Sequence, residues 1–423
     1  MRAIVGLVLL FTACAQTEAE LQAKREACDF APGAVEKSNI PIDTFVILVL
    51  ENRSFDHLLG GLRASYPEVD LAPDDAMNPD ASGAPVARHH LEVRCITDTE
   101  HEWMGAHAEW NEGKNDGFVK ANAGAADDPS GSRAMGYYDA RELPTLHALA
   151  GAYATSDRHF SSLLGPTLPN RMFLFAGTSF GVSRGRIIGD RQPNLFDAMD
   201  AAGVDWAEYH EDLISSSILL ETFLRHYETP HYPGLDQFFA DAAGGTLKPV
   251  SFVEGKLAVD DGHPPGHVML TDQLIRRVVE AVSQGPQWGR AAILISFDEN
   301  GGLYDHVPPP SACVPDDHPA DEGGWGFDRY GFRVPLVVVS PWAKRHQLGH
   351  RVTDHTSILR LIEGRFGLPA FTRRDANADP LSELFDFASA PRMTPAPLPP
   401  LVIDAADVQD CQTRHPASEA SGP

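Results

Sequence analysis

The sequence has little positive charge, few cysteines and no apolar run long enough to cross a membrane as a helix. Its 423 residues include 34 Lys and Arg against 59 Asp and Glu, a formal net charge of −25. A chain this acidic repels the phosphate backbone, which excludes nonspecific nucleic-acid binding, although a metal ion could still hold a phosphate group locally. Hydrophobic residues make up 43% and charged residues 22%, as in soluble globular chains, which excludes wholesale disorder and a polytopic membrane protein.

The first residues have the layout of an export signal. Met1 and Arg2 give a short positive start, residues 3–11 form an apolar run too short to span a bilayer, and Cys14 follows two small residues. Cys14 resembles the site where bacterial lipoproteins are cleaved and acylated. We therefore expect an exported envelope protein with a signal over residues 1–13, attached to the membrane only through a lipid on Cys14. An ordinary secretory signal, giving a periplasmic or secreted protein, is the alternative.

The cysteines agree with export. Besides Cys14 the chain contains Cys28, Cys95, Cys313 and Cys411. Four thiols in an exported chain can form two disulfides in three connectivities. Because Cys28 and Cys411 lie in the two flanking tails, we expect the pairs Cys28–Cys411 and Cys95–Cys313. Free buried thiols are the alternative.

Composition divides the chain into a polar leader over residues 14–41, a central domain over 42–387 and a Pro-rich tail over 388–423. Five prolines between 391 and 400 predict that this tail is extended. No internal repeat is visible.

Short apolar runs alternate with stretches of helical periodicity. The clearest strand predictions are residues 45–50, 291–297 and 336–339, and weaker ones are 204–209 and 250–253. Helices are predicted over 270–282, from its apolar face, and from an Asp354 N-cap to Gly364. This alternation predicts an α/β fold with a mostly parallel sheet, in which sites form beyond the carboxyl ends of the strands.

Two of the predicted strands run directly into acidic motifs. Glu51 and Asn52 follow the first strand, and Asp298 and Glu299 follow the strand at 291–297. Adjacent buried carboxylates repel each other and are tolerated mainly when a cation lies between them. These four side chains therefore predict a divalent metal site. Alternatively, the second pair caps a glycine turn and Glu51 pairs with Arg53.

A threonine stands at a turn before a helix. Residues 165–171 read Gly-Pro-Thr-Leu-Pro-Asn-Arg, so Thr167 is expected near a helix N-terminus, where the amides and the helix dipole favour an anion. A hydroxyl there could attack phosphorus if a metal lowered its pKa. An N-cap threonine without a catalytic role is the alternative.

Most of the 18 histidines must be structural. His101 and His263 stand in polar motifs, and His306 and His355 lie next to motifs at predicted strand ends. A protonated histidine at an oxyanion and a neutral histidine on a metal are the two useful roles in such a site.

Several long motifs occur in order over residues 43–370. They are ENRSFDH at 51–57, WNEGKNDGF at 110–118, MGYYD at 135–139, GPTLPNR at 165–171, DENGGLYDHVPPP at 298–310, YGFRVPLVVVSPW at 330–342 and DHTSILRLIE at 354–363. Together they resemble the bacterial phosphoesterase family, which contains phosphatidylcholine-type phospholipases C and a related acid phosphatase. The resemblance implies an alkaline-phosphatase-like three-layer sandwich around a mostly parallel central sheet.

The resemblance also implies roles for individual residues. Thr167 would be the nucleophile of a covalent phosphothreonine intermediate and would complete a metal shell made by Glu51, Asn52, Asp298 and Glu299. His101 and His263 would face the phosphate as catalytic residues, with substrate contacts from Asn170 and His210; His355 is a weaker candidate. The identity of the divalent ion stays open, because oxygen-rich shells accept several ions.

These features predict an exported metal-dependent phosphoesterase that acts on a phosphate ester or a phospholipid. The sequence does not separate a phospholipase C from an acid phosphatase. The alternatives are a phosphate- or phospholipid-binding lipoprotein without turnover and a sulfatase-like or phosphonate hydrolase. The latter is disfavoured because the turn at 165–171 lacks the sulfatase nucleophile motif. Nothing in the sequence indicates an oligomeric state.

Overall fold

A seven-stranded sheet forms the centre of the computed structural model, which describes residues 17–186, 188, 191–212, 216–226 and 229–415. Its strand order is β11-β6-β10-β9-β1-β8-β7. β10 pairs antiparallel with both of its neighbours, whereas every other pairing in this sheet is parallel. The strands are β1 (Thr44–Leu50), β6 (Ala154–Ser156), β7 (Trp206–Tyr209), β8 (Val250–Val253), β9 (Ala291–Phe297), β10 (Leu336–Val339) and β11 (Gln347–Gly349).

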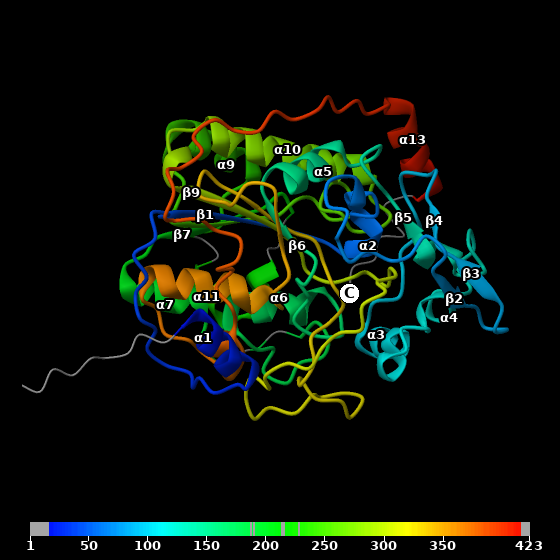
Figure 1. Ribbon diagram of the computed structural model, residues 1–423, viewed down its shortest axis with the longest axis horizontal. Coiled ribbons are helices and arrows are strands. Elements are labelled where there is room, and N and C mark those ends of the chain that lie inside the picture. Colours follow the sequence, from blue (N-terminus) through cyan, green and yellow to red (C-terminus); the bar gives the residue numbers. More distant parts are fainter. Residues whose placement is uncertain (1–16, 187, 189–190, 213–215, 227–228, 416–423) are drawn as a thin grey trace, which may run out of the picture.

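Helices cover both faces of this sheet, which makes three layers (Figure 1). One face carries α5 (Pro144–Ala152), α9 (Leu235–Gly244) and α10 (Val268–Gln284), and the other carries α6 (Thr167–Ala176), α7 (Leu195–Ala202) and α11 (His355–Phe366). The predicted α/β class with a mostly parallel sheet is therefore confirmed.

The main predicted elements occur within a few residues of their expected bounds. All five predicted strands form, as β1, β7, β8, β9 and β10. The helix predicted over 270–282 is α10, and α11 begins at His355 with Asp354 as its N-cap. Within the central sheet, β6 and β11 were not predicted, because three-residue strands are too short to show a sequence period.

Apolar burial explains why β1 and β9 lie at the centre. Every residue of both strands is buried, and each fully buried large aliphatic side chain stabilises the fold by about 1.5–3 kcal/mol. The strands pair in parallel with Leu50 opposite Phe297. This register brings the residues that follow the two strands, Glu51 and Asp298, to the same edge of the sheet.

Smaller elements make up the rest of the described fold, and several of them lie to the right in Figure 1. Short strands form two pairs, β2 with β3 and β4 with β5. These elements are α2 (Phe55–Leu58), β2 (Met77–Pro79), β3 (Pro85–Ala87), β4 (His89–His90), α3 (Trp103–Trp110), α4 (Phe118–Ala121), β5 (Gly136–Tyr137), α8 (Glu221–His226), α12 (Arg373–Asn377) and 3-10 helices at Leu62–Ala64, Asn111–Gly113, Ser132–Met135, Ser216–Leu219 and Trp288–Arg290.

The predicted disulfide pairing is wrong. The structure contains Cys28–Cys313 and Cys95–Cys411 instead. α1 (Glu18–Glu26), just before Cys28, and α13 (Ala405–Arg414), which contains Cys411, lie at opposite ends of the molecule (Figure 1). Cys28 and Cys411 therefore lie far apart, and each is bonded to a cysteine of the region between the two tails.

The C-terminal tail is extended only in its first part. It crosses the helical layer, where Trp288 Nε1 donates to the carbonyl of Met393 at 2.8 Å and Arg276 donates to the carbonyl of Pro399. It then forms α13, which was not predicted, with Asp404 accepting from the Ala406 amide as N-cap.

The expected signal segment and Cys14 lie outside the described residues. Within the part of the chain that the structure describes, no helix combines the length and apolar character needed to cross a membrane.

Candidate active site

The two acidic motifs meet at the carboxyl ends of β1 and β9. Asp298 N donates to the Leu50 carbonyl at 3.0 Å, and Asn52 N donates to Asp298 Oδ1 at the same distance. Asn52 is fully buried in the left-handed region, with φ of 56°. Gly301 allows this close approach, because a Cβ atom on it would lie 2.1 Å from the Asn52 carbonyl oxygen. The expected meeting of the two motifs is therefore present.

Thr167 lies at the start of α6 and points toward this cluster. Its Oγ1 donates to Asn52 Oδ1 at 3.2 Å. The preceding Pro166 is extended and occupies the N-cap position, so the free amides of the first helical turn and the helix dipole favour an anion beside Thr167. The hydroxyl is thus placed where a phosphoryl group could be held and attacked.

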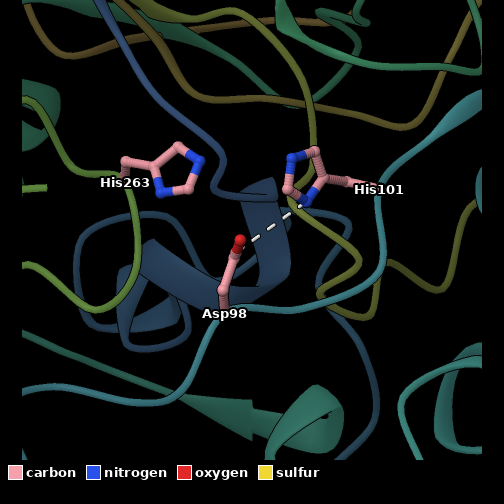
Figure 2. A group of neighbouring side chains, drawn as sticks. All are labelled: Asp98, His101 and His263. Carbon is pink, nitrogen blue, oxygen red and sulfur yellow. Dashed lines mark ion pairs between the residues drawn. The ribbon is translucent and has the colours of Figure 1, made fainter. Parts of the chain in front are cut away.

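The rings of His101 and His263 lie edge to face beside the same site, with ring centroids 5.6 Å apart (Figure 2). His101 Nδ1 lies 2.5 Å from the Thr99 carbonyl, and His101 Nε2 lies 3.2 Å from Asn52 Nδ2. Since a carbonyl can only accept, Nδ1 carries the proton and the lone pair on Nε2 accepts from Asn52. His263 Nδ1 donates to its neighbouring carbonyl, that of Pro264, which leaves its Nε2 free for a substrate.

A buried arginine links three of the acidic side chains. Arg171 Nη2 lies 2.9 Å from Glu51 Oε1, Nη1 lies 2.8 Å from Glu254 Oε1, and Nε lies 3.5 Å from Asp298 Oδ2. Arg171 is 2% exposed, so water screens these contacts little. Its charge compensates only part of the cluster, which also contains Asp261 and Glu299.

Burial dominates the electrostatics of the remaining carboxyl groups. It raises the pKa of Glu51 to about 8 against the lowering effect of Arg171, with Asp298 and Glu254 adding repulsion. Burial, with repulsion from Asp298, also holds the pKa of Glu299 well above its usual range. Burial, with repulsion from Glu51, does the same for the pKa of Asp261. The single positive charge of Arg171 is too small to compensate all the carboxyl groups of this cluster.

Two buried carboxylate oxygens of the cluster have the chemistry of divalent-cation ligands. Asp298 Oδ2 and Glu299 Oε1 are buried oxygens without a hydrogen-bond donor among the described residues. Buried unsatisfied carboxylate oxygens are rare, and several on adjacent side chains are hard ligands suited to Mg²⁺, Ca²⁺ or a similar ion. The residue set is thus chemically suitable for the predicted metal.

A cavity of about 1020 Å³ opens beside this cluster. Its volume is at the upper end for small-ligand sites, so it can hold more than a phosphate group. Asn52, Asp298 and Glu299 do not line it but lie behind it, with Asn52 connected to Thr167 and His101. The polar lining residues include Glu51, Asp98, Glu100, His101, Glu102, Thr167, Arg171, Arg184, His210, Asp212, Glu254, Asp261 and His263.

Three of the candidate residues lie away from the cavity. The Asn170 side chain contacts the loop before α6, accepting from the amides of Ser162 and Leu163 and donating to the Gly165 carbonyl at 2.8 Å. It therefore braces the turn that presents Thr167. His306 pairs with Asp56 Oδ2 at 2.6 Å, and His355 Nε2 donates to the Phe297 carbonyl at 3.0 Å. By contrast, His210 does line the cavity.

Sequence reasoning missed three charged residues of the site: Arg171, Glu254 and Asp261. Arg171 ends the GPTLPNR motif, and Asp261 precedes His263 by two residues. Glu254 directly follows β8, so the strand-end rule that found Glu51 and Asp298 would also have found it. Because the strand at 250–253 was predicted only weakly, the rule was not applied to the residue that follows it.

Comparison with known proteins identifies the family of this chain. The Phosphoesterase family matches residues 42–369. The chain is 31% identical over 388 residues to non-specific phospholipase C1 of Arabidopsis thaliana, covering 83% of this chain and 72% of the plant protein. It is also 31% identical over 419 residues to phospholipase C A of Mycobacterium tuberculosis, covering 84% and 79% of the two chains.

Solved structures are only distantly similar to this chain. Lipoteichoic acid synthase LtaP from Listeria monocytogenes matches with a TM-score of 0.44 and 9% identity, covering 85% of this chain and 81% of its own. The family match extends over most of the chain and includes both strand-end motifs and the Thr167 turn. The chain therefore belongs to the Phosphoesterase family and is a hydrolase that acts on phosphoric ester bonds.

Proposed function

We propose that this protein is an exported, metal-dependent phospholipase C-type enzyme that works through a covalent phosphothreonine intermediate. One observation carries the proposal: the Thr167 hydroxyl stands at a helix N-terminus, 3.2 Å from Asn52 Oδ1, beside a buried carboxylate cluster that borders a large cavity. The names of its relatives, which are phospholipases C, support the same reaction.

Glu51, Asn52, Asp298 and Glu299, together with Thr167, would hold the divalent ion. When bound, the ion supplies positive charge that favours the ionised hydroxyl and offsets the charge of the phosphoryl oxygens. The resident Arg171 remains paired with Glu51 and Glu254 and fixes their positions.

In the first step, Thr167 Oγ1 gives its proton to His263 Nε2 and forms a bond to phosphorus, while the bond from phosphorus to the alcohol oxygen breaks. The leaving alcohol oxygen takes this proton from His263, and His101 Nε2 holds the Asn52 amide whose oxygen accepts from Thr167. In the second step, water attacks phosphorus, the Thr167–phosphorus bond breaks and the threonine hydroxyl is restored. The amides of the first turn of α6 stabilise the negative oxygens throughout.

The charge of the cavity favours a diester over a monoester. A phosphomonoester is a dianion and needs unpaired cationic side chains to hold it. The two arginines of the lining are already paired: Arg171 contacts Glu51 and Glu254, and Arg184 contacts Glu322. A singly charged phosphodiester needs fewer unpaired cationic side chains to bind. We therefore assign the phospholipase C reaction rather than the acid-phosphatase reaction.

Two disulfides support export, because such bonds form and persist in oxidising compartments. The predicted signal over 1–13 and the lipid on Cys14 remain part of this proposal.

The function is tested with p-nitrophenylphosphorylcholine and p-nitrophenyl phosphate, with and without chelator. We expect the diester to be hydrolysed faster, and chelation to abolish activity until a divalent ion is restored. Thr167→Val should lower kcat by about 10⁴-fold or more, as for loss of other nucleophiles, whereas Thr167→Ser should retain a hydroxyl and measurable turnover. Near-full activity of the valine variant would refute the nucleophile.

A separate variant tests the metal ligands. Asp298→Asn should lose bound metal, measured by elemental analysis, together with activity. Full metal content in this variant would show that the proposed ligand set is wrong. Activity that survives complete chelation would refute the metal dependence itself.

A further inference from the structure

The lining of the cavity is strongly acidic. Seven carboxylate side chains line it, against two arginines and three histidines. Glu51 and Glu254 pair with Arg171, and Asp261 and Glu100 accept from backbone amides of their own loops. Of the other three, the Glu102 side chain has no hydrogen-bond partner among the described residues, and Asp98 and Asp212 each accept from one backbone amide, so we take these three as the candidates for binding a positively charged part of the substrate.

These three carboxylates are close in the chain to residues that contact the phosphate position. Asp98 is exposed, and its Oδ1 lies 3.8 Å from His101 Nδ1 (Figure 2). Glu102 follows His101 directly; its backbone N donates to Glu100 Oε1 at 3.1 Å, and its side chain makes no hydrogen bond or ion pair with any described residue. Asp212 uses Oδ2 to accept from the Leu257 amide at 2.6 Å. Asp98, Glu102 and Asp212 are called the acidic wall below.

The positive side chains of the lining offset the acidic wall only in part, through the Coulombic interaction of Arg184 with Glu102. Arg171 is buried with Glu51 and Glu254, and Arg184 forms a two-bond ion pair with Glu322. The nearby His101 is only half-buried, so its contact with Asp98 is a weak, screened one. The wall therefore presents net negative charge to the cavity.

The described lining also contains no Phe, Tyr or Trp side chain. The nearest aromatic in sequence, Trp103, is only 1% exposed and packs on Phe327 and His107. Proteins that select a quaternary ammonium group surround it with aromatic faces. Carboxylates instead favour an ammonium that carries N–H groups, because they can accept hydrogen bonds from it.

We propose that the acidic wall selects a phosphodiester whose head group carries a primary ammonium, of the ethanolamine type, over the quaternary choline type. This inference rests on the proposed function. In both head groups two methylene carbons separate the ester oxygen from the nitrogen, so the reach of the head group does not distinguish them. Only the primary ammonium can donate hydrogen bonds there, whereas the trimethylated nitrogen gains the Coulombic attraction alone.

The experiment compares three soluble dihexanoyl phospholipids that share their acyl chains. Their head groups are ethanolamine, choline and uncharged propanol, and kcat/KM is measured for each at low and high salt. We expect ethanolamine to exceed choline by at least about 3-fold and propanol by at least about 10-fold, which correspond to one or two charge-assisted contacts partly screened by water. Both advantages should shrink at high salt.

A double variant assigns the effect to the wall. Glu102→Gln with Asp212→Asn should reduce the ethanolamine-to-propanol ratio by about 5-fold or more. The matched control, Glu68→Gln with Asp75→Asn, removes two exposed charges that do not line the cavity and should leave the ratio unchanged.

The outcomes separate the inference from the function. Equal rates on all three lipids, a preference for choline, or an unchanged ratio in the wall variant would overturn the inference while leaving the phospholipase reaction intact. Failure to hydrolyse any of the three lipids, with metal present, would refute the proposed function itself.

Discussion

Arg171 Nη2 lies 2.9 Å from Glu51 Oε1, and both side chains are almost completely enclosed by protein. The same guanidinium contacts Glu254 at 2.8 Å. Arginine holds two carboxylates in fixed positions because its N–H groups form a rigid planar fork. Arg171 thereby connects the carboxyl ends of β1 and β8 to α6, the helix that begins with Thr167.

Changing Arg171 should separate positioning from charge. Arg171→Lys keeps the charge but cannot hold both carboxylates, so we expect kcat/KM to fall by at least about 10-fold for misplaced site groups. Arg171→Ala leaves buried carboxylates without their partner and should lower the free energy of unfolding by about 3–5 kcal/mol. Urea unfolding and diester hydrolysis measure the two effects.

An exposed arginine provides the matched control. Arg141 pairs with Asp139 at 2.9 Å and its side chain is 59% exposed. Arg141→Lys should change the free energy of unfolding by no more than about 0.5 kcal/mol. If Arg171→Lys behaved like this control in both measurements, Arg171 would have no positioning role.

The strand-end part of the site was predictable because its signals are local. An apolar run that ends in an acid identifies both the strand and the residue at its carboxyl end, as at Glu51 and Asp298. Parallel pairing then brings such residues together without any further information. The Thr167 turn was found in the same way, from proline and glycine positions within seven residues.

What could not be predicted depends on contacts between distant segments. Arg171 occupies a helix whose sequence does not reveal that Glu51 and Glu254 lie beside it. His306 and His355 stand next to active-site motifs, yet hydrogen bonds to Asp56 and to the Phe297 carbonyl hold them in structural roles. The cysteine pairing failed for the same reason, because the order of the tails in sequence does not determine where they pack.

The disulfides give a direct chemical prediction. A non-reducing peptide map of the protein should recover Cys28 with Cys313 and Cys95 with Cys411. Each bond closes a long loop, with sequence separations of 285 and 316 residues. Loss of either pair by double Cys→Ser substitution should therefore lower the free energy of unfolding by about 2–5 kcal/mol. A peptide linking Cys28 with Cys411 would contradict the structure.

Asp272 gives a prediction about pH. This residue of α10 is fully buried and caps α5, accepting from the Thr145 amide at 2.9 Å and from the Leu146 amide at 2.8 Å. Burial raises the pKa of Asp272 to about 6 in spite of these hydrogen bonds, whereas an unfolded aspartate has a pKa of about 3.9. Between these values the folded protein binds a proton that the unfolded chain does not, so stability falls as pH rises from about 4 to 6.

Asp272→Asn removes this titration and isolates its contribution. At about 1.4 kcal/mol per pKa unit, the free energy of unfolding of the wild type should fall by up to about 3 kcal/mol relative to the variant between pH 4 and pH 7. Urea unfolding across this range measures the difference, and the exposed Asp75→Asn control should run parallel to the wild type. If the stability curves of Asp272→Asn and the wild type instead ran parallel across this pH range, Asp272 would be ionised in the folded protein. The two amide hydrogen bonds would then outweigh the effect of burial.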